Sequence, residues 1–429
     1  MIRTIAFYTF ITLSFINVLH YGAYLVGANI YDIRALKTKH RASKRRRHRE
    51  VPLVSVLVPA HNEALTVLRC LESIHKNSYR KLQIIVINDA STDETGTIAQ
   101  DFAKTHQNSR RDIRVVNKRR NVGKAAALNS VLRRGYVQGD LVMTLDADSF
   151  IAPDAIEKAV KYFHDPNVAG VAANVRIMHQ SSILGILQRF EHMIGYRSKK
   201  FYDVSNSEFV VGGVASTFRR EAMSQVGYYN TNTATEDISL SLKIVSQGNK
   251  GSRIVYGVDI RAMTEGVQTY RALLKQRYRW KLGTLQNLIQ FRSLVFNRDR
   301  KYSRMLTFYR MPMAFLSELM LLVEPIIVLY LLVLSLRQGY VGFVAGAYLL
   351  ISLITAITLW QDEHLPLKQK VRLSAYVPFM YFAYYIMNTV QILAVIQCVL
   401  KPKRLLGEAK EGNMWKSPER LGKHLLTSS

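Results

Sequence analysis

The sequence predicts a doubly wound, Rossmann-like α/β domain embedded between transmembrane α-helices, and three observations lead to this fold class. From Pro52 onward, short apolar runs alternate with helical stretches, as in domains built on a parallel sheet. Apolar blocks long enough to cross a bilayer lie before and after that region. The formal net charge of +28 gathers beside these blocks, which disfavours an ordinary soluble enzyme.

The sheet is expected to contain four continuous apolar strands. They lie at residues 53–59, 82–88, 113–117 and 141–146, with intervening helices at 65–75, 93–104 and 124–134. Continuous apolar runs are typical of strands that are buried on both faces of a sheet. Ligands of such sheets bind beyond the carboxyl ends of the strands. Asp89 and Asp146 stand at two of these ends and are therefore expected to converge on one crevice.

The N-terminal segment is expected to anchor the protein in a membrane. Residues 5–30 are apolar and a basic cluster follows them, so we expect a signal anchor at 1–33, its N-terminus outside, and a basic juxtamembrane linker at 34–51. A cleaved signal peptide is disfavoured because the segment is long and the basic residues come after it. Nucleic acid is disfavoured as a partner since no aromatic residues are interleaved with the cluster, and anionic lipid head groups fit better.

The C-terminal part of the chain poses a conflict of topology. A cytoplasmic α/β domain at 52–300 is followed by an expected transmembrane region at 301–400 and a basic tail at 401–429. That region holds three apolar blocks, at about 311–336, 340–360 and 375–400. Three spans would place the tail outside, whereas its basic residues favour the cytoplasm. A re-entrant or interfacial block among the three would remove the conflict.

Two helices within the α/β region combine an apolar face with a charged one. The first, at 183–194, suits an interfacial helix and an amphipathic core helix equally well. The second, at 267–291, carries many cations among its leucines, and we expect it at the membrane surface.

The loops that follow the first two strands offer groups for a nucleotide. Asp89 can accept hydrogen bonds from a base or a ribose, or it can simply shape its turn. The segment that contains Pro59, Ala60 and Glu63 could cradle a nucleotide with backbone groups, and Glu63 could reach a ribose hydroxyl. Ordinary loop polarity explains this second segment equally well.

Two carboxylate motifs follow further along the chain. Asp146-Ala147-Asp148 brings two carboxylates to one turn, which suits a hard cation such as Mg²⁺, or Mn²⁺, that also bridges a diphosphate. Such triplets are common by chance, and the position after an apolar strand strengthens the interpretation. Thr235-Glu236-Asp237 precedes an expected helix, so Asp237 is either a capping residue or a general base for an acceptor hydroxyl.

The pentad Gln276-Arg277-Tyr278-Arg279-Trp280 places an amide, two guanidinium groups and an indole within about one and a half helical turns. Arg279 can pair with diphosphate oxygens as a planar fork, with Gln276 beside it. Trp280 can present its apolar ring face to a sugar. A basic helix lying on lipid head groups is the alternative.

These four motifs in this order resemble those of processive, membrane-embedded family 2 glycosyltransferases, which read D, D-x-D, T-E-D and Q-x-x-R-W. Residues 209–220 and the tail residues 415–420 are similar to segments of poly-β-1,6-N-acetylglucosamine synthases. The resemblance implies a GT-A fold and a processive enzyme of the plasma membrane. It would polymerise a β-linked biofilm polysaccharide from UDP-N-acetylglucosamine and export it. Chitin, hyaluronan and cellulose synthases share the catalytic motifs and stay open as alternatives.

The resemblance also implies residue roles. Asp237 would be the catalytic base, and Asp146 and Asp148 would hold the metal. Lys124, in Asn121-Val122-Gly123-Lys124-Ala125, matches a family lysine near the nucleotide. Acceptor binding would fall to Gly212, Gly213, Glu236 and Trp280. The residues expected to bind the UDP-sugar are Pro59, Ala60, Glu63, Asp89, Lys124, Asp146, Asp148, Gln276, Arg279 and Trp280.

The expected partners are the growing polysaccharide, membrane lipids and a small membrane accessory subunit. Two further functions stay open from the residues alone. One is the transfer of a single sugar to a lipid acceptor, and the other is a membrane-anchored sensor of sugar nucleotides without turnover.

Overall fold

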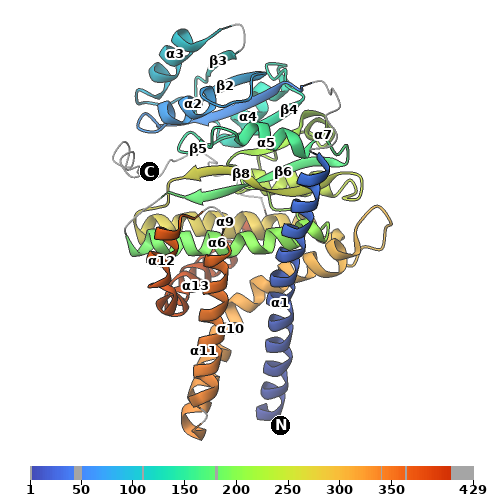
Figure 1. Ribbon diagram of the computed structural model, residues 1–429, viewed down its shortest axis with the longest axis vertical. Coiled ribbons are helices and arrows are strands. Elements are labelled where there is room, and N and C mark those ends of the chain that lie inside the picture. The colour runs from blue at the N-terminus through green and yellow to red at the C-terminus, as the bar shows by residue number, and fades with distance from the viewer. Residues whose placement is uncertain are drawn as a thin grey trace.

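The computed structural model of the protein describes residues 2–42, 51–108, 111–178, 182–339, 341–362 and 365–406. It is elongated and has three parts along its long axis (Figure 1). An α/β domain forms one end, the helices α6 (Ile183–Val204) and α9 (Tyr270–Gln290) lie across beneath it, and further helices extend away from that pair. Residues 415–420, which carry part of the family resemblance, lie outside the described residues.

The four expected strands and three expected helices of the α/β domain are confirmed. The strands are β1 (Val54–Ala60), β2 (Leu82–Asn88), β3 (Arg111–Asn117) and β4 (Leu141–Thr144). The helices are α2 (Val67–His75), α3 (Thr95–His106) and α4 (Lys124–Arg133). Every residue of β1, β2 and β4 is buried, as expected of strands covered on both faces. β3 is partly exposed because it lies at the edge of the sheet.

The complete sheet is mixed rather than purely parallel, with the strand order β3-β2-β1-β4-β7-β6-β8-β5. The additional strands are β5 (Phe150–Ile151), β6 (Val168–Ile177), β7 (Ser216–Arg219) and β8 (Arg253–Thr264). β1 pairs in parallel with both β2 and β4, whereas β7 is antiparallel to its neighbours β4 and β6. The chain thus leaves β1 in one direction toward β2 and β3 and returns on its other side as β4. In α/β sheets, ligands bind at the point where the strand order changes direction in this way.

Three further helices complete the α/β domain, namely α5 (Ala155–Tyr162), α7 (Arg220–Gln225) and α8 (Glu236–Val245). α8 matters most for the site, because its first two residues are the acidic pair of the Thr-Glu-Asp motif.

α6 lies between the α/β domain and the apolar helices and is buried along part of its surface. Its Leu187 and Phe190 are almost fully buried, in one cluster with Leu273 of α9 and apolar residues of the C-terminal helices. Of the two interpretations of this segment, the structure favours the amphipathic core helix. The membrane-surface position expected for α9 stays a prediction, since its Leu273 belongs to the same buried cluster.

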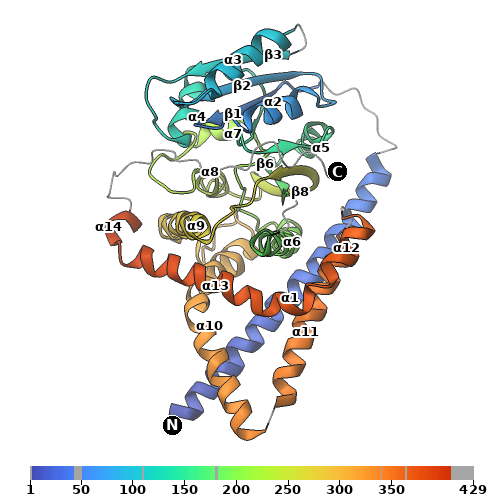
Figure 2. The same cartoon turned by 90° about the vertical axis from the view of Figure 1, so that its left-hand side faces the viewer.

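The C-terminal apolar blocks form helices, some of which run along the long axis of the molecule while one lies across it. The helices are α10 (Met311–Gln338), α11 (Val341–Trp360), α12 (Leu367–Ser374), α13 (Val377–Val399) and α14 (Pro402–Leu405). α10 and α11, like α1 (Ile2–Ala42), run along the long axis, whereas α13 lies across it beneath α6 and α9 (Figures 1 and 2). α14 consequently returns to α9, where the Gln286 amide donates to the backbone carbonyl of Arg404 at 2.7 Å.

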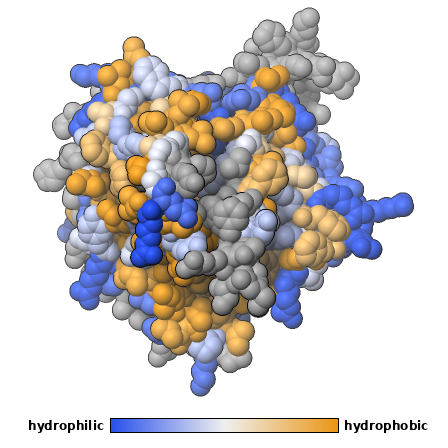
Figure 3. Space-filling view, turned by 90° about the horizontal axis from the view of Figure 1, so that it is seen from below, coloured by the Kyte–Doolittle hydropathy of each residue, from blue (hydrophilic) through white to orange (hydrophobic). Residues whose placement is uncertain are grey.

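Within the described residues, two helices are long and apolar enough to cross a membrane by length and composition, Met305–Gln338 and α13. The former begins as a π-helix at Met305–Arg310 and continues into α10. Hydrophobic side chains gather over much of the face seen from the helical end of the molecule (Figure 3). They include the exposed Ile326 and Leu329 of α10 and Leu349 and Leu353 of α11. The other expected spans stay predictions.

Candidate active site

A cluster of charged side chains joins three elements just beyond the carboxyl end of β4. Lys124 begins α4, Asp146 follows β4, and Glu236 begins α8. The Lys124 Nζ atom lies 2.6 Å from Asp146 Oδ1 and 3.3 Å from Glu236 Oε1. The structure therefore brings together the lysine, the first aspartate of D-x-D and the acidic pair of Thr-Glu-Asp, which are far apart in the sequence.

Gly213 lies directly against this cluster. A Cβ atom at this position would lie 2.7 Å from Lys124 Nζ, 3.4 Å from Asp237 Oδ2 and 3.7 Å from Asp146 Oδ2. A side chain here would therefore displace the ammonium group of Lys124 from its present position. By contrast, a Cβ atom at Gly212 would meet nothing within 4 Å. The segment expected to bind the acceptor thus borders the charged cluster at Gly213.

The electrostatics of the cluster favour Asp237 as a proton acceptor. Burial, together with the neighbouring charge of Glu236, raises the pKa of Asp237 to about 6, against the opposing effects of Lys124 and the Ile238 N–H. Burial alone would lower the pKa of Lys124, but the charges of Asp146, Glu236 and Asp237 outweigh it and raise that pKa. A carboxylate with a pKa near the working pH beside a permanent cation suits general base catalysis.

The two carboxylates of D-x-D are oxygen donors suited to a hard cation. Among the residues that the structure describes, no group of three or more His, Cys, Asp or Glu side chains forms a metal cage. Mg²⁺ is commonly held by only one or two carboxylates together with substrate phosphates, so Asp146 and Asp148 fit a metal that arrives with a diphosphate. Asp148 Oδ1 accepts from Ser149 Oγ at 2.8 Å, and Asp146 is shared with Lys124. A bound cation there would neutralise charge on the leaving diphosphate.

Asp89 fixes the loop that leads into α4. It is fully buried, and its carboxylate accepts from the backbone N–H groups of Val122 at 3.1 Å and Gly123 at 2.9 Å. Gly123 has φ 85° and ψ 154°, a conformation that favours glycine. Asp89 therefore shapes the turn that positions Lys124, and its contact with a uridine stays a prediction.

Pro59, Ala60 and Glu63 occupy buried positions at the end of β1. Glu63 is only 2% exposed, and its Oε2 atom accepts from Thr66 Oγ1 at 2.9 Å. A ribose contact would require this carboxylate to leave its buried position. The structure thus groups Lys124 and Asp146 with the Thr-Glu-Asp pair, but not with Glu63.

α9 holds the segment that precedes Asp237. A Cβ atom at Gly283 would lie 2.5 Å from Thr235 Cγ2 and closer still to Thr235 Oγ1. The Asn287 amide donates to the same hydroxyl at 3.1 Å, and Gln286 Oε1 accepts from the Ala234 N–H at 3.0 Å. Sequence reasoning missed Gly283 and Asn287. They follow Trp280 by three and seven residues, so all three lie on one face of the helix, and this spacing was the signal that could have identified them.

The pentad shares that helical face. In a helix, residues three or four apart lie on one side. The side that contacts Thr235 therefore includes, in order, Gln276, Arg279, Trp280, Gly283 and Asn287. The expected diphosphate-binding and acceptor-binding groups thus share a helical face with the residues that hold Thr235, and their substrate contacts stay predictions.

Arg277 has a structural task that sequence reasoning also missed. It is 4% exposed, and its Nη2 atom pairs with Glu191 Oε2 of α6 at 2.6 Å. Its guanidinium carbon lies 4.2 Å from the centre of the Trp280 ring, a cation–π contact. Arg277 therefore ties α9 to α6 and orients the indole, whereas Arg279 is exposed. Glu191 lies on the charged face that the sequence predicts for α6, and that face alone did not identify its partner.

Comparisons with known proteins place this chain among glycosyltransferases. Residues 55–227 match the family model of glycosyl transferase family 2. A poly-β-1,6-N-acetyl-D-glucosamine synthase of Staphylococcus epidermidis is 32% identical over 252 residues, which cover 57% of this chain and 57% of the relative. The enzyme of that name from Staphylococcus aureus is 34% identical over 244 residues, which cover 56% and 57%. The matched part of the chain thus spans little more than half the length of these relatives.

A solved structure shares the fold over most of its length. It is a mannosyltransferase from Pyrobaculum calidifontis in complex with GDP-Man and Mn²⁺, with a TM-score of 0.57 and 21% sequence identity. The likeness covers 89% of this chain and 95% of that one. It supports a GT-A-like fold with a mixed sheet.

Proposed function

Because the chain carries a family 2 glycosyltransferase domain at residues 55–227, we propose that it is a membrane-bound, inverting enzyme that polymerises a β-linked polysaccharide from a UDP-sugar. The observation that carries the proposal is the cluster in which Lys124, Asp146 and Glu236 surround Asp237 beside the backbone of Gly213. The names of the similar relatives favour a β-1,6-linked polymer of N-acetylglucosamine as the product, for which UDP-N-acetylglucosamine would be the donor.

In the proposed reaction, Asp237 removes the proton from an acceptor hydroxyl. The freed oxygen forms a bond to the anomeric carbon of the donor sugar, while the bond from that carbon to UDP breaks on the opposite face. The reaction therefore inverts the configuration at that carbon. Lys124 keeps a positive charge near the diphosphate, and Asp146 and Asp148 would hold Mg²⁺ or Mn²⁺ there. Gln276 and Arg279 would bind the diphosphate, and Trp280 the acceptor sugar.

The helices support a membrane position for this enzyme. We assign residues 1–33 to an outward-facing N-terminal anchor, 34–51 to its basic linker, 52–300 to the cytoplasmic catalytic domain and 301–400 to the membrane region. With α10 and α11 as a hairpin of spans and α13 lying across them, α14 returns to the cytoplasmic side (Figure 2). The basic residues of the tail at 401–429 then obey the positive-inside rule. The growing chain would leave past α9 through these helices, contacting lipids and a small accessory subunit.

The proposal is tested with purified full-length protein, Mg²⁺ and a panel of UDP-sugars. We expect a long polymer from UDP-N-acetylglucosamine that only a β-1,6-specific hydrolase degrades. Asp237→Asn should abolish transfer and still bind UDP, whereas Asp101→Asn, on the exposed surface of α3, should be active. Polymer synthesis by Asp237→Asn protein would exclude this residue as the base. A product of one sugar on a lipid would overturn polymerisation, and no UDP release with any sugar or metal would favour a sensor.

A further inference from the structure

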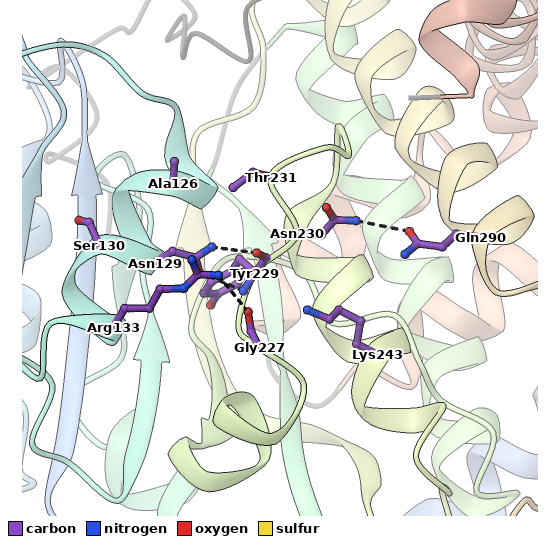
Figure 4. Close-up of a pocket in the computed structure, with 10 residues that line it drawn as sticks. All are labelled: Ala126, Asn129, Ser130, Arg133, Gly227, Tyr229, Asn230, Thr231, Lys243 and Gln290. Atoms are coloured by element: carbon purple, nitrogen blue, oxygen red, sulfur yellow. Dashed lines mark hydrogen bonds between the residues drawn. The ribbon is translucent and has the colours of Figure 1, made fainter. Parts of the chain in front are cut away.

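A cavity of about 530 Å³ lies outside the cluster described above (Figure 4). Its walls come from α4, the segment 227–231, α8 and the end of α9, and they include Asn129, Arg133, Lys243 and Gln290. The lining residues of α4 fall at positions 126, 129, 130 and 133, on the side of the helix opposite Lys124, since each residue turns about 100°. The cavity and the candidate active site therefore use different faces of α4.

The side chains that line the cavity favour a negatively charged ligand. The lining contains two cations, Arg133 and Lys243, and no acidic residue. Both cations bond only to neutral backbone in this region: Lys243 donates to the Tyr228 carbonyl at 2.7 Å and Arg133 to the Gly227 carbonyl at 3.5 Å. Burial and the neighbouring charge of Arg133 lower the pKa of Lys243, as expected where positive charge lacks a counter-charge.

We propose that this cavity binds a small soluble molecule that carries phosphate, with Arg133 and Lys243 on the phosphate oxygens. Arginine matches phosphate as a planar two-pronged donor, and lysine adds a point charge. The volume lies within the range of about 300–1,000 Å³ that is usual for small-molecule sites. It exceeds the size of a phosphate ion and leaves room for the remainder of the ligand between the segment 227–231 and α9.

The cavity is connected to Asp237 through the chain segment between them and through α9. Its wall residue Asn230 donates to Gln290 of α9 at 3.3 Å, and the chain continues from Asn230 directly to Thr235 and Asp237. α9 in turn holds Thr235 through Gly283 and Asn287. A ligand that bridges α4 and the segment 227–231 is therefore expected to stabilise the arrangement of this segment against α9 by mass action.

The test is calorimetric titration of inorganic pyrophosphate into full-length protein in detergent, with EDTA and saturating UDP to suppress binding at the active site. We expect one site per chain. Arg133→Gln and Lys243→Gln should each weaken binding by about tenfold or more, since a charged hydrogen bond contributes about 1.5–3 kcal/mol and 1.4 kcal/mol is tenfold. Arg134→Gln is the matched control, because it removes the same charge one residue outside the lining. Lys243→Arg should retain binding.

Equal weakening by Arg134→Gln would show diffuse attraction and overturn the site, as would the absence of pyrophosphate binding. Binding of nanodiscs that contain phosphatidic acid, without binding of pyrophosphate, would overturn the assignment to a soluble ligand. Asp237→Asn should bind pyrophosphate as the wild type does, which separates this proposal from the catalytic one. Melting temperatures of the unliganded variants show whether each is folded.

Discussion

Replacement of Gly283 by alanine is expected to disable sugar transfer while leaving the protein folded. Gly283 faces Thr235, two residues before the proposed base Asp237, and the new Cβ atom would lie 2.5 Å from Thr235 Cγ2 and 2.8 Å from its Cβ. Carbon atoms in contact are normally about 3.5–4.0 Å apart. The segment that carries Asp237 must therefore move by about 1 Å relative to α9.

The magnitudes separate an effect on catalysis from an effect on stability. Overpacking by the added methyl group lowers the stability of the folded state by about 1–3 kcal/mol. The higher helix propensity of alanine relative to glycine raises that stability by about 1 kcal/mol. The net loss of stability is thus about 0–2 kcal/mol, a small change. A displacement of about 1 Å at a catalytic group costs about 100-fold in rate. We expect kcat to fall about 100-fold while the affinity for UDP changes little.

The assay is release of UDP from UDP-N-acetylglucosamine by purified protein, with UDP affinity and melting temperature measured in parallel. Gly195→Ala is the matched control, because Gly195 lies within α6 and its Cβ atom would meet nothing within 4 Å. This control should be fully active and slightly more stable. A Gly283→Ala enzyme with kcat within about twofold of the wild type would refute the idea that α9 fixes the base.

Two further predictions concern α6. Glu191→Gln leaves the buried guanidinium of Arg277 without its counter-charge and should destabilise the protein by about 3–5 kcal/mol, seen as a lower melting temperature. Burial raises the pKa of Asp203 from its ordinary 3.8 to about 7, despite a hydrogen bond from the Tyr256 N–H. The folded state thus binds this proton more tightly than the unfolded state does. The proton contributes about 4 kcal/mol to the free energy of unfolding, and this contribution is fully present below pH 3.8 and is lost as the pH rises through about 7. Asp203→Asn should therefore melt higher than the wild type at pH 8 but not at pH 4, and equal melting at pH 8 would contradict this reasoning.

Much of the α/β domain was predictable because local patterns determine it. The four apolar runs became β1 to β4 within two residues of the expected limits, since a strand buried on both faces needs an unbroken apolar run. The position of Asp146 at a strand end likewise predicted that it would lie at the crevice. The mixed character of the sheet was not predictable in this way, because the pairing of β7 with β4 joins segments about 70 residues apart.

The site shows the same division. The residue types and their order pointed to transfer from a nucleotide-activated sugar. A base suits the acceptor hydroxyl, a pair of carboxylates suits a metal, and a guanidinium suits the diphosphate. The sequence favoured Arg279 in the pentad and left Arg277 without a role. Only the packing of α9 against α6 shows that Arg277 is buried with Glu191 and stacked on Trp280.

The fold class, the apolar helices and the inventory of chemical groups could be predicted before folding was considered, because they depend on composition and on periodicities of a few residues. The contacts of those groups arise only when the chain is folded. Asp89 holds the loop before Lys124, Gly283 supports Thr235, and α13 lies across the helices that accompany it. Such contacts join segments tens to hundreds of residues apart, and they depend on how whole faces pack rather than on any local pattern.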